Sequence, residues 1–373
     1  MFFEMAGLLR KVYEVHIEVA DSCNLDCGYC YYVSKRKKTE AFPLSQFEAI
    51  FERLFTESRE DINIVFHGGE PLLRPASWFD ERCASARKLA ERHGKLIRFQ
   101  LLTNGTLLND EHVAVFAKHH VVVSVSLDAP SDVHNAMRGG FAKTVSAIQR
   151  LQEAGVFGSV IAVISKHNYD KVADAVGLFK DLHVKQYHFN IASIVGEDKS
   201  LVLSKDEMLV YYKEAYKAFK ENYKEICDWM LLGKLKRLVE GRISEFHCDS
   251  PICGAGLFKI HILPDGTYYP CGSCVTTETA RQQLKQGNLL DPSQDRDENF
   301  LKDFHSLYFD NREKCEQCEA AIVCDFYCPA FDKMDPITAD HRCEANQMLY
   351  AFLLEQDRKE MEEIVNYYKT QLS

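Results

Sequence analysis

Residues 23–30 read Cys-Asn-Leu-Asp-Cys-Gly-Tyr-Cys, so that Cys23, Cys27 and Cys30 form the pattern CxxxCxxC directly after the first predicted strand, Val12–Val19. Cysteine thiolates are the usual ligands of iron–sulfur clusters, which normally take four of them. Because this motif offers three, a four-iron cluster bound here would keep one iron without a protein ligand. That iron could chelate a small molecule with an amine and a carboxylate. The alternative is a zinc site on Cys27 and Cys30 with partners elsewhere.

The chain around this motif alternates short β-rich runs with amphipathic stretches. The predicted strands are Val12–Val19, Ile62–Phe66, Ile97–Thr103, Val121–Leu127, Ser159–Ile164 and Gln186–Ile191. The predicted helices are Ser45–Glu57, Ser77–Arg92, Asp110–Lys118, Lys143–Ala154 and Asp170–Leu182. This alternation predicts an α/β fold with βαβ units and a parallel sheet. Six units favour an open or partial barrel over a full eight-unit barrel, and in either layout the functional residues follow the carboxyl ends of the strands.

The amino-acid composition limits the classes of protein to which this chain can belong. The chain has 373 residues, enough for two domains, and its 46% apolar and 27% charged residues are ordinary globular usage. The net charge of −10 argues against a nucleic-acid-binding surface. No apolar run approaches the ~18 residues of a membrane helix, and Met1–Lys11 lacks the apolar stretch of a signal peptide. Without an export signal, the 14 cysteines indicate metal or redox chemistry in a reducing compartment, the cytoplasm.

The second half of the chain has a different pattern. Residues 204–239 carry apolar positions at helical spacing. The stretch Phe246–Cys343 loses this periodicity and holds nine of the cysteines, and Glu344–Lys369 is again an amphipathic helical pattern. We therefore expect a barrel over residues 1–203, a helical bridge over 204–245 and a cysteine-rich domain with a C-terminal helix over 246–373.

The first cysteine motif resembles the signature of the radical S-adenosylmethionine superfamily, CxxxCxΦC with an aromatic residue at Φ. Cys23, Cys27, Tyr29 and Cys30 match it in full. The resemblance implies a partial (βα)6 barrel and a four-iron cluster whose open iron chelates S-adenosylmethionine. It also implies that an electron from the cluster cleaves this cofactor to methionine and a 5′-deoxyadenosyl radical, with Tyr29 near the adenine.

Further positions after the predicted strands match elements of the same family. Gly68-Gly69-Glu70-Pro71 follows the second strand and matches a GGEP element that binds the methionine amino group. Its glycines let the backbone approach a ligand closely, and Glu70 can accept from an ammonium. The resemblance also assigns cofactor contacts after the third and fourth strands, to Asn104, Ser126, Asp128 and Arg138. Taken singly, these segments could be ordinary turns.

The cysteines of the last third match the SPASM domain, which is found on radical enzymes that modify peptides and proteins. The resemblance implies two auxiliary four-iron clusters, and hence three clusters in the chain. One would be bound by Cys315, Cys318, Cys324 and Cys343, and the other by Cys253, Cys271 and Cys328. Cys274 is the candidate for the remaining ligand, with Cys248 or an open position as alternatives. A zinc ribbon explains Cys315 and Cys318 alone but not the later cysteines. Cys83 and Cys227 lie in helical patterns, where we expect buried thiols.

Two subfamilies fit this architecture: anaerobic sulfatase-maturating enzymes, which make formylglycine, and maturases that crosslink or oxidise ribosomally made peptides. In the first, an Asp that directly follows the second SPASM cysteine serves as general base. The matching position here is Gly272, which favours peptide maturation. A non-catalytic electron carrier is a third reading, which the cofactor-binding residues disfavour.

The predicted partners follow from this reading. They are a precursor peptide and an electron donor such as flavodoxin or ferredoxin. Only 22 residues precede Cys23, too few for an N-terminal leader-binding domain of roughly eighty residues as the family has it. We therefore expect a separate small protein or the barrel surface to bind the leader. Neither nucleic acid nor a membrane is expected as a partner.

Overall fold

The computed structural model describes residues 9–30, 42–192, 199–241, 253–306, 312–324, 328–330 and 336–372. The chain divides into two compact units. Unit 1 comprises Met1–Ser126, Ala142–Gly158 and Gly254–His305, and unit 2 comprises Leu127–Phe141, Ser159–Cys253 and Ser306–Ser373.

Unit 1 is built on a mainly parallel sheet with the strand order β10-β9-β8-β1-β2-β3-β4. Neighbouring strands from β8 through β1, β2 and β3 to β4 are parallel, and β9 is antiparallel to both β8 and β10. The strands are β1 (Glu14–Ala20), β2 (Ile62–Gly68), β3 (Ile97–Thr103), β4 (Val121–Ser126), β8 (Lys259–Ile262), β9 (Thr267–Tyr269) and β10 (Gly287–Asn288). The predicted α/β fold with a parallel sheet is confirmed.

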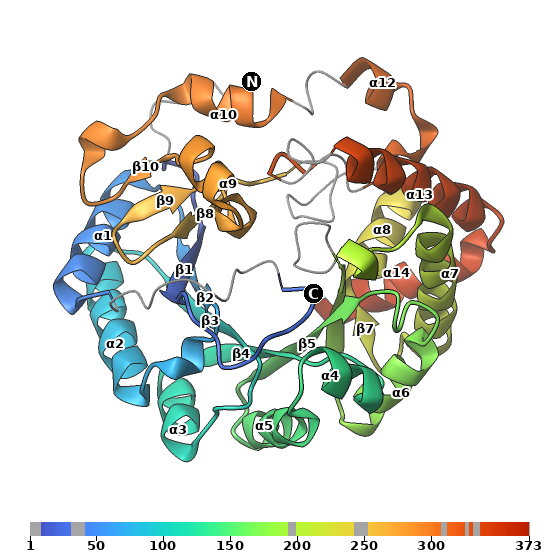
Figure 1. Ribbon diagram of the computed structural model, residues 1–373, viewed down its shortest axis with the longest axis horizontal. Helices are drawn as coiled ribbons and strands as arrows, with labels where there is room; N and C mark the ends of the chain where they lie inside the picture. Colours follow the sequence, from blue (N-terminus) through green and yellow to red (C-terminus); the bar gives the residue numbers. More distant parts are fainter. Residues whose placement is uncertain are drawn as a thin grey trace. The chain divides into compact units, whose positions relative to one another are not determined.

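Helices cover one face of this sheet, as Figure 1 shows for α1, α2 and α3. The α-helices of unit 1 are α1 (Leu44–Glu57), α2 (Ala76–Arg92), α3 (Asp110–His119), α5 (Phe141–Glu153), α9 (Glu278–Gln283) and α10 (Glu298–Phe304). Three short 3-10 helices accompany them, η1 (Pro71–Leu73), η3 (Gly272–Val275) and η4 (Pro292–Gln294). The buried residues of α1 recur at helical spacing, from Phe47 to Phe55. Between sheet and helices, the Phe79 ring lies 5.4 Å from that of Phe66 and 5.5 Å from that of Phe116.

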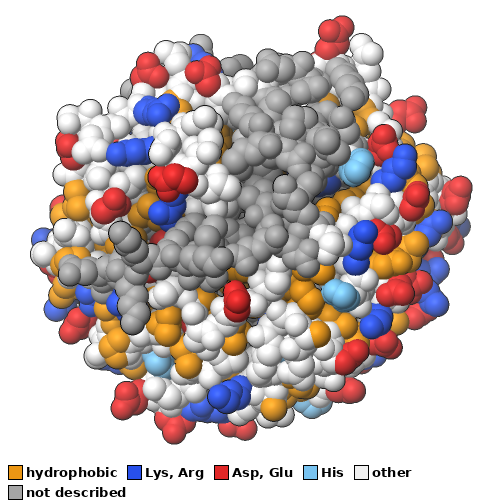
Figure 2. Space-filling view, viewed as in Figure 1, with side chains coloured by type: hydrophobic (Ala, Val, Ile, Leu, Met, Phe, Trp, Pro, Cys, Tyr) orange, Lys and Arg blue, Asp and Glu red, His pale blue; other side chains and the backbone are white. Residues whose placement is uncertain are grey.

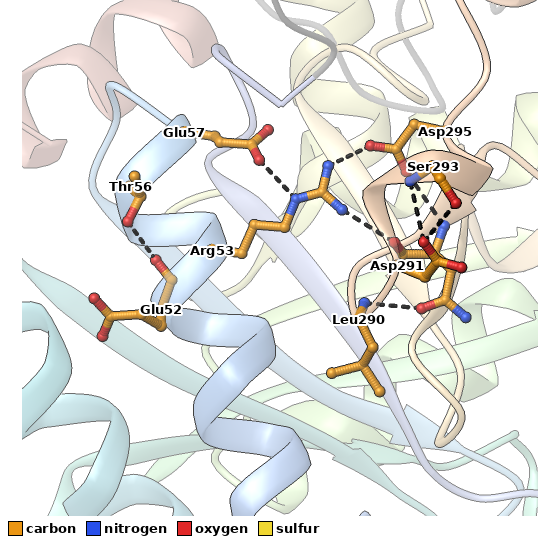
Figure 3. Close-up of polar contacts among 9 residues, drawn as sticks. Glu52, Arg53, Thr56, Glu57, Leu290, Asp291, Ser293 and Asp295 are labelled. Atoms are coloured by element: carbon orange, nitrogen blue, oxygen red, sulfur yellow. Dashed lines mark hydrogen bonds and ion pairs between the residues drawn. The ribbon is translucent and has the colours of Figure 1, made fainter.

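Residues 254–305 belong to unit 1, although the sequence predicts that they form part of a separate C-terminal domain. Strand β8 extends the sheet by pairing in parallel with β1. Arg53 of α1 fixes the segment that follows β10: its guanidinium donates to the Asn288 carbonyl at 3.0 Å and forms ion pairs with Asp295 and with Glu57 (Figure 3). This contact joins α1 to the segment after β10 within unit 1, and the predicted domain boundaries stay a prediction.

Unit 2 contains a second group of parallel strands in the order β5-β6-β7, and helices precede, connect and follow these strands in the chain. The strands are β5 (Phe157–Ile164), β6 (Gln186–Ile191) and β7 (Cys227–Asp228). The helices are α4 (Ser131–Met137), α6 (Val172–Asp181), η2 (Lys199–Leu201), α7 (Lys205–Asn222), α8 (Trp229–Glu240), α12 (Arg312–Glu316), η5 (Glu319–Ile322), α13 (Pro336–Leu354) and α14 (Arg358–Leu372).

The predicted helical bridge and the predicted C-terminal helix each comprise two helices in the structure. Residues 204–239 form α7 and α8, with the short strand β7 between them. Helix α8 begins after Asp228, whose carboxylate accepts a hydrogen bond from Leu231 N at 3.0 Å and caps the helix N-terminus. The predicted C-terminal helix is α13 and α14, and Asp357 between them accepts from Lys359 N at 2.9 Å. Local side-chain caps therefore override the continuous apolar pattern.

The described surface carries charges of both signs. Lys and Arg side chains are interspersed with Asp and Glu on the face drawn in Figure 2. Among the helices that the structure describes, none is both long enough and apolar enough to cross a lipid bilayer.

Candidate active site

The loop after β1 carries the three cysteines of the first motif. Cys23, Cys27 and Cys30 are half-buried, and Tyr29 beside them is buried. The loop closes on itself, because Cys30 N donates to the Cys27 carbonyl at 3.0 Å and Leu25 N to the Cys23 sulfur at 3.4 Å. Burial raises the pKa of the Cys23 thiol, so a bound metal must stabilise the thiolate. Three soft thiol donors in one short loop fit a cluster that takes three protein ligands.

Gly68 and Gly69 allow the end of β2 to pack closely against this loop. Gly69 N donates to the Ala20 carbonyl at 2.7 Å, and Glu70 N to the Ser22 carbonyl at 3.0 Å. A Cβ on Gly69 would lie 2.2 Å from the Ser22 oxygen, and one on Gly68 would lie 2.4 Å from the Ala20 oxygen. Gly68 also has a φ of +126°, a backbone conformation that glycine tolerates best. These glycines allow two backbone segments to touch, and their predicted approach to a ligand stays a prediction.

Glu70 connects the ends of β2 and β3. Its fully buried carboxylate accepts from Leu72 N at 2.9 Å, from the Thr103 hydroxyl at 2.6 Å and from Asn104 N at 2.8 Å. Burial raises the pKa of Glu70, and these three hydrogen bonds oppose the shift. Pro71 begins η1 directly after it. The predicted role of Glu70 with the methionine ammonium stays a prediction.

Asn104 extends from the end of β3 to the cysteine loop. Its side-chain amide nitrogen lies 3.0 Å from Asn24 Oδ1 and 3.9 Å from Cys23 Sγ. Thr106 completes a closed set of contacts, since its hydroxyl donates to Asn104 Oδ1 at 2.6 Å and accepts from Asn24 Nδ2 at 2.8 Å. Hydrogen bonds to cluster sulfurs are one of the ways in which a protein sets a cluster's reduction potential. Asn104 is thus placed beside a predicted ligand thiol, a contact that the sequence did not reveal.

The sequence analysis also did not predict a polar cluster on one face of β1, β2 and β8. The His261 ring nitrogen Nε2 lies 3.3 Å from the carboxylate of Glu18, and Arg281 lies 3.7 Å from the same carboxylate. The His67 ring lies 6.4 Å from that of His261, and burial lowers the pKa of His67 to about 3, so its imidazole is neutral at pH 7. The alternation Glu14-Val-His16-Ile-Glu18 was the available signal, because parallel strands with both faces covered are usually apolar throughout.

The remaining predicted cofactor contacts are divided between the units. Ser126 ends β4 in unit 1, whereas Asp128 and Arg138 lie in unit 2. Arg138 Nε donates to Asp128 Oδ2 at 2.9 Å, and Asp128 Oδ1 accepts from Val163 N at 2.8 Å. The structure therefore brings Asp128 and Arg138 together as a mostly buried ion pair. Their contact with a cofactor stays a prediction.

Cys271 and Cys274 form a close pair of thiols at η3 in unit 1. Their sulfurs are 3.7 Å apart, and the hydrogen bond between them lowers the pKa of Cys271. Cys248, the alternative ligand, lies outside the described residues, and the assignment of Cys274 as the additional ligand stays a prediction. Cys253 and Cys328, the other predicted ligands of that cluster, belong to unit 2.

The cysteines predicted to bind the other auxiliary cluster all lie in unit 2. Cys318 N donates to the Cys315 carbonyl at 3.1 Å, and Cys318 and Cys324 flank η5. Helix α13, which carries Cys343, packs against η5. Within the described ranges, no three His, Cys, Asp or Glu side chains are gathered closely enough to hold a single metal ion. The prediction that Cys83 and Cys227 are buried thiols is confirmed.

The family model of the radical SAM superfamily matches residues 17–179, the part of the chain that carries the cysteine loop and the segments after β2, β3 and β4. The chain thus contains a radical SAM domain, and the membership predicted from the cysteine motif is confirmed. Along most of its length it is similar to enzymes that mature sulfatases and peptides.

Two relatives illustrate the sequence similarity. A protein of Synechocystis is 28% identical over 243 residues, which cover 62% of this chain but only 58% of that protein. A serine-type anaerobic sulfatase-maturating enzyme of Bacteroides thetaiotaomicron is 26% identical over 359 residues, which cover 87% of this chain and 84% of that enzyme.

Solved structures show the same fold. The enzyme anSMEcpe with bound AdoMet has a TM-score of 0.81 at 20% identity, covering 95% of this chain and 99% of that one. Streptococcus suis SuiB bound to its precursor peptide SuiA has a TM-score of 0.60 at 20% identity, covering 86% of this chain and 74% of that one.

We predict that Gly69→Ala displaces the cysteine loop, because its Cβ would overlap the Ser22 carbonyl. The free energy of unfolding should fall by more than ~2 kcal/mol, and iron bound after anaerobic reconstitution should decrease. Denaturant unfolding and iron analysis measure both. The matched control is Gly177→Ala in α6, where a Cβ meets nothing within 4 Å and the change should be neutral or stabilising. Equal stability and iron content in both variants would contradict the proposed contact.

We predict that Glu70→Gln destabilises the protein even without any cofactor. The substituted amide nitrogen cannot accept a hydrogen bond, so at least one of the three buried donors loses its acceptor, at a cost of ~1–3 kcal/mol. Urea unfolding of the cofactor-free protein measures this loss. Glu91→Gln, an exposed position on α2, should change stability by less than ~0.5 kcal/mol. If Glu70→Gln and Glu91→Gln unfold at the same urea concentration, the conclusion that Glu70 connects the ends of β2 and β3 is wrong.

Proposed function

We propose that this protein is a radical S-adenosylmethionine enzyme with a SPASM domain that modifies a ribosomally made precursor peptide in the cytoplasm, by a crosslink or an oxidation. It would hold three four-iron clusters and receive electrons from a flavodoxin or a ferredoxin. When bound, the first cluster and S-adenosylmethionine supply a 5′-deoxyadenosyl radical. Cys23, Cys27 and Cys30 would hold that cluster, while Glu70 and Asn104 fix the neighbouring turn against the loop.

The choice of peptide modification over formylglycine formation rests on Gly272, which directly follows Cys271 and is the first residue of η3. In sulfatase-maturating enzymes an Asp at the matching position serves as general base. Gly272 has no side chain and cannot remove the proton from a Cys or Ser side chain. Loss of a positioned general base typically lowers a rate by ~10²–10⁴. The likeness to SuiB, whose structure was solved with the precursor peptide SuiA, supports a peptide as substrate.

The second candidate function is formylglycine formation on a sulfatase. It is favoured by the similarity to the Bacteroides thetaiotaomicron enzyme, which extends over 359 residues and covers 87% of this chain. In that case another group must replace the missing Asp.

Mass spectrometry of peptide products distinguishes the two functions. The reconstituted enzyme is incubated anaerobically with S-adenosylmethionine, reductant and a Cys-x-Pro-x-Arg peptide, with an anaerobic sulfatase-maturating enzyme as positive control. We expect 5′-deoxyadenosine but no conversion of the peptide cysteine to the aldehyde. A short peptide encoded beside the gene should instead lose two hydrogens per crosslink. Multiple-turnover aldehyde formation would reject peptide maturation and establish the second candidate.

A further inference from the structure

The side-chain amide of Asn104 has an orientation that its neighbours determine. Thr106 N donates to Asn104 Oδ1 at 2.9 Å, and the Thr106 hydroxyl donates to the same oxygen at 2.6 Å. Because a backbone N–H can only donate, the carbonyl oxygen of this amide faces Thr106 and its nitrogen faces the cysteine loop. The two hydrogens of that nitrogen then have one acceptor each, Asn24 Oδ1 at 3.0 Å and Cys23 Sγ at 3.9 Å.

The backbone of Asn104 is held from two further sides. Its N–H donates to the buried Glu70 carboxylate at 2.8 Å, and its carbonyl accepts from the Thr144 hydroxyl of α5 at 3.0 Å. The residue itself is buried, with 7% of its surface exposed. An N–H dipole fixed in this way needs no reorganisation when negative charge develops in front of it, and water screens it only weakly. Asn104 therefore directs the positive end of a fixed dipole at the sulfur of Cys23.

We propose that Asn104 raises the reduction potential of the four-iron cluster bound by the first cysteine motif, through an N–H···S hydrogen bond from its side-chain amide to Cys23. This role rests on the first cluster of the proposed function. Reduction makes a cluster and its thiolate ligands more negative, so a donor directed at a ligand sulfur stabilises the reduced form more than the oxidised form. Hydrogen bonds to the sulfurs are among the factors that set the potentials of such clusters. Leu25 N, 3.4 Å from the same sulfur, supplies a second donor.

Asn104 acts in this proposal as a positioning residue that affects electron delivery. A higher potential makes the cluster easier to reduce by the electron donor, before S-adenosylmethionine is cleaved. A purely structural role would have a different consequence. If Asn104 only held the cysteine loop, its loss would lower the amount of iron bound without changing the potential of the clusters that form.

Two substitutions remove the donor in different ways. Asn104→Leu replaces the amide by an apolar group of similar size, and Asn104→Asp replaces the amide nitrogen by an oxygen that carries negative charge. Thr106→Val is the matched control. It removes the hydroxyl that contacts both Asn24 and Asn104, but it keeps the backbone N–H that orients the Asn104 amide. This control loosens the hydrogen-bond network without removing the donor to Cys23.

The experiment is an anaerobic redox titration of the full-length protein, followed by electron paramagnetic resonance. The signal of the first cluster is the one that is absent when Cys23, Cys27 and Cys30 are replaced by Ala. Iron and sulfide analysis establishes that each variant is loaded. At the midpoint potential of the parent protein, Asn104→Leu should lower the ratio of reduced to oxidised cluster by about threefold or more, a tenfold change corresponding to ~59 mV for a one-electron couple. Asn104→Asp should lower this ratio further, and Thr106→Val should leave it near that of the parent.

An unchanged midpoint in fully loaded Asn104→Leu protein would overturn the proposal. An equal shift in Thr106→Val would also overturn it, because the network and not the donor would then set the potential. Failure of the proposed function gives a different result, namely iron-loaded unaltered protein with no signal that depends on the three cysteines. That result would overturn the first cluster and the role of Asn104 together.

A measurement that keeps Asn104 decides the question if its variants do not bind iron. The protein is prepared with asparagine labelled with ¹⁵N at the side-chain amide. Asn24→Asp removes the other labelled amide of this network and keeps an oxygen as acceptor for Asn104. Pulsed electron paramagnetic resonance of the reduced first cluster should then show a hyperfine coupling to ¹⁵N. The absence of this coupling in the loaded protein would overturn the proposed hydrogen bond.

Discussion

The contact between the loop after β1 and the end of β2 is the constraint on which the site depends. Two backbone hydrogen bonds join Gly69 and Glu70 to the Ala20–Ser22 segment, at a distance that no side chain on the glycines would permit. This contact places the loop that carries Cys23 directly beside the buried Glu70. Glu70 in turn holds the turn at Thr103 and Asn104, and Asn104 reaches back to Cys23. Three segments that are distant in sequence thus fix one another at the carboxyl ends of three neighbouring strands.

Much of this arrangement could be predicted from the sequence because it depends on local patterns. The strands β2, β3 and β6 start and end within two residues of their predicted bounds, since runs of β-branched and aromatic residues alternate with amphipathic helices. The cysteine spacing indicated the radical SAM domain without any knowledge of its geometry. The Gly68-Gly69-Glu70 segment is conspicuous by its motif, but its packing against the cysteine loop is visible only in the fold, and its approach to a ligand stays a prediction.

The features that escaped prediction depend on contacts between distant segments. Strand β8 has only four residues, Lys259–Ile262, and its pairing with β1 cannot be seen in its composition. Asn104 resembled a turn residue, and only the fold shows its amide beside Cys23. Lys234 lies in an amphipathic helix pattern where a lysine normally faces solvent, and its burial depends on the packing of α8 against η5. Tertiary contacts, not local propensity, decide each of these cases.

We propose that the loop with Cys23, Cys27 and Cys30 holds the cluster required for cleavage of S-adenosylmethionine. The decisive measurement is the quantification of 5′-deoxyadenosine and methionine by mass spectrometry, after anaerobic reconstitution and addition of a strong reductant. The unaltered protein should form both products in equal amounts, and a variant with all three cysteines replaced by Ala should form neither. Undiminished product formation by that variant would exclude this role of the loop, as would the absence of products from unaltered protein with a loaded cluster.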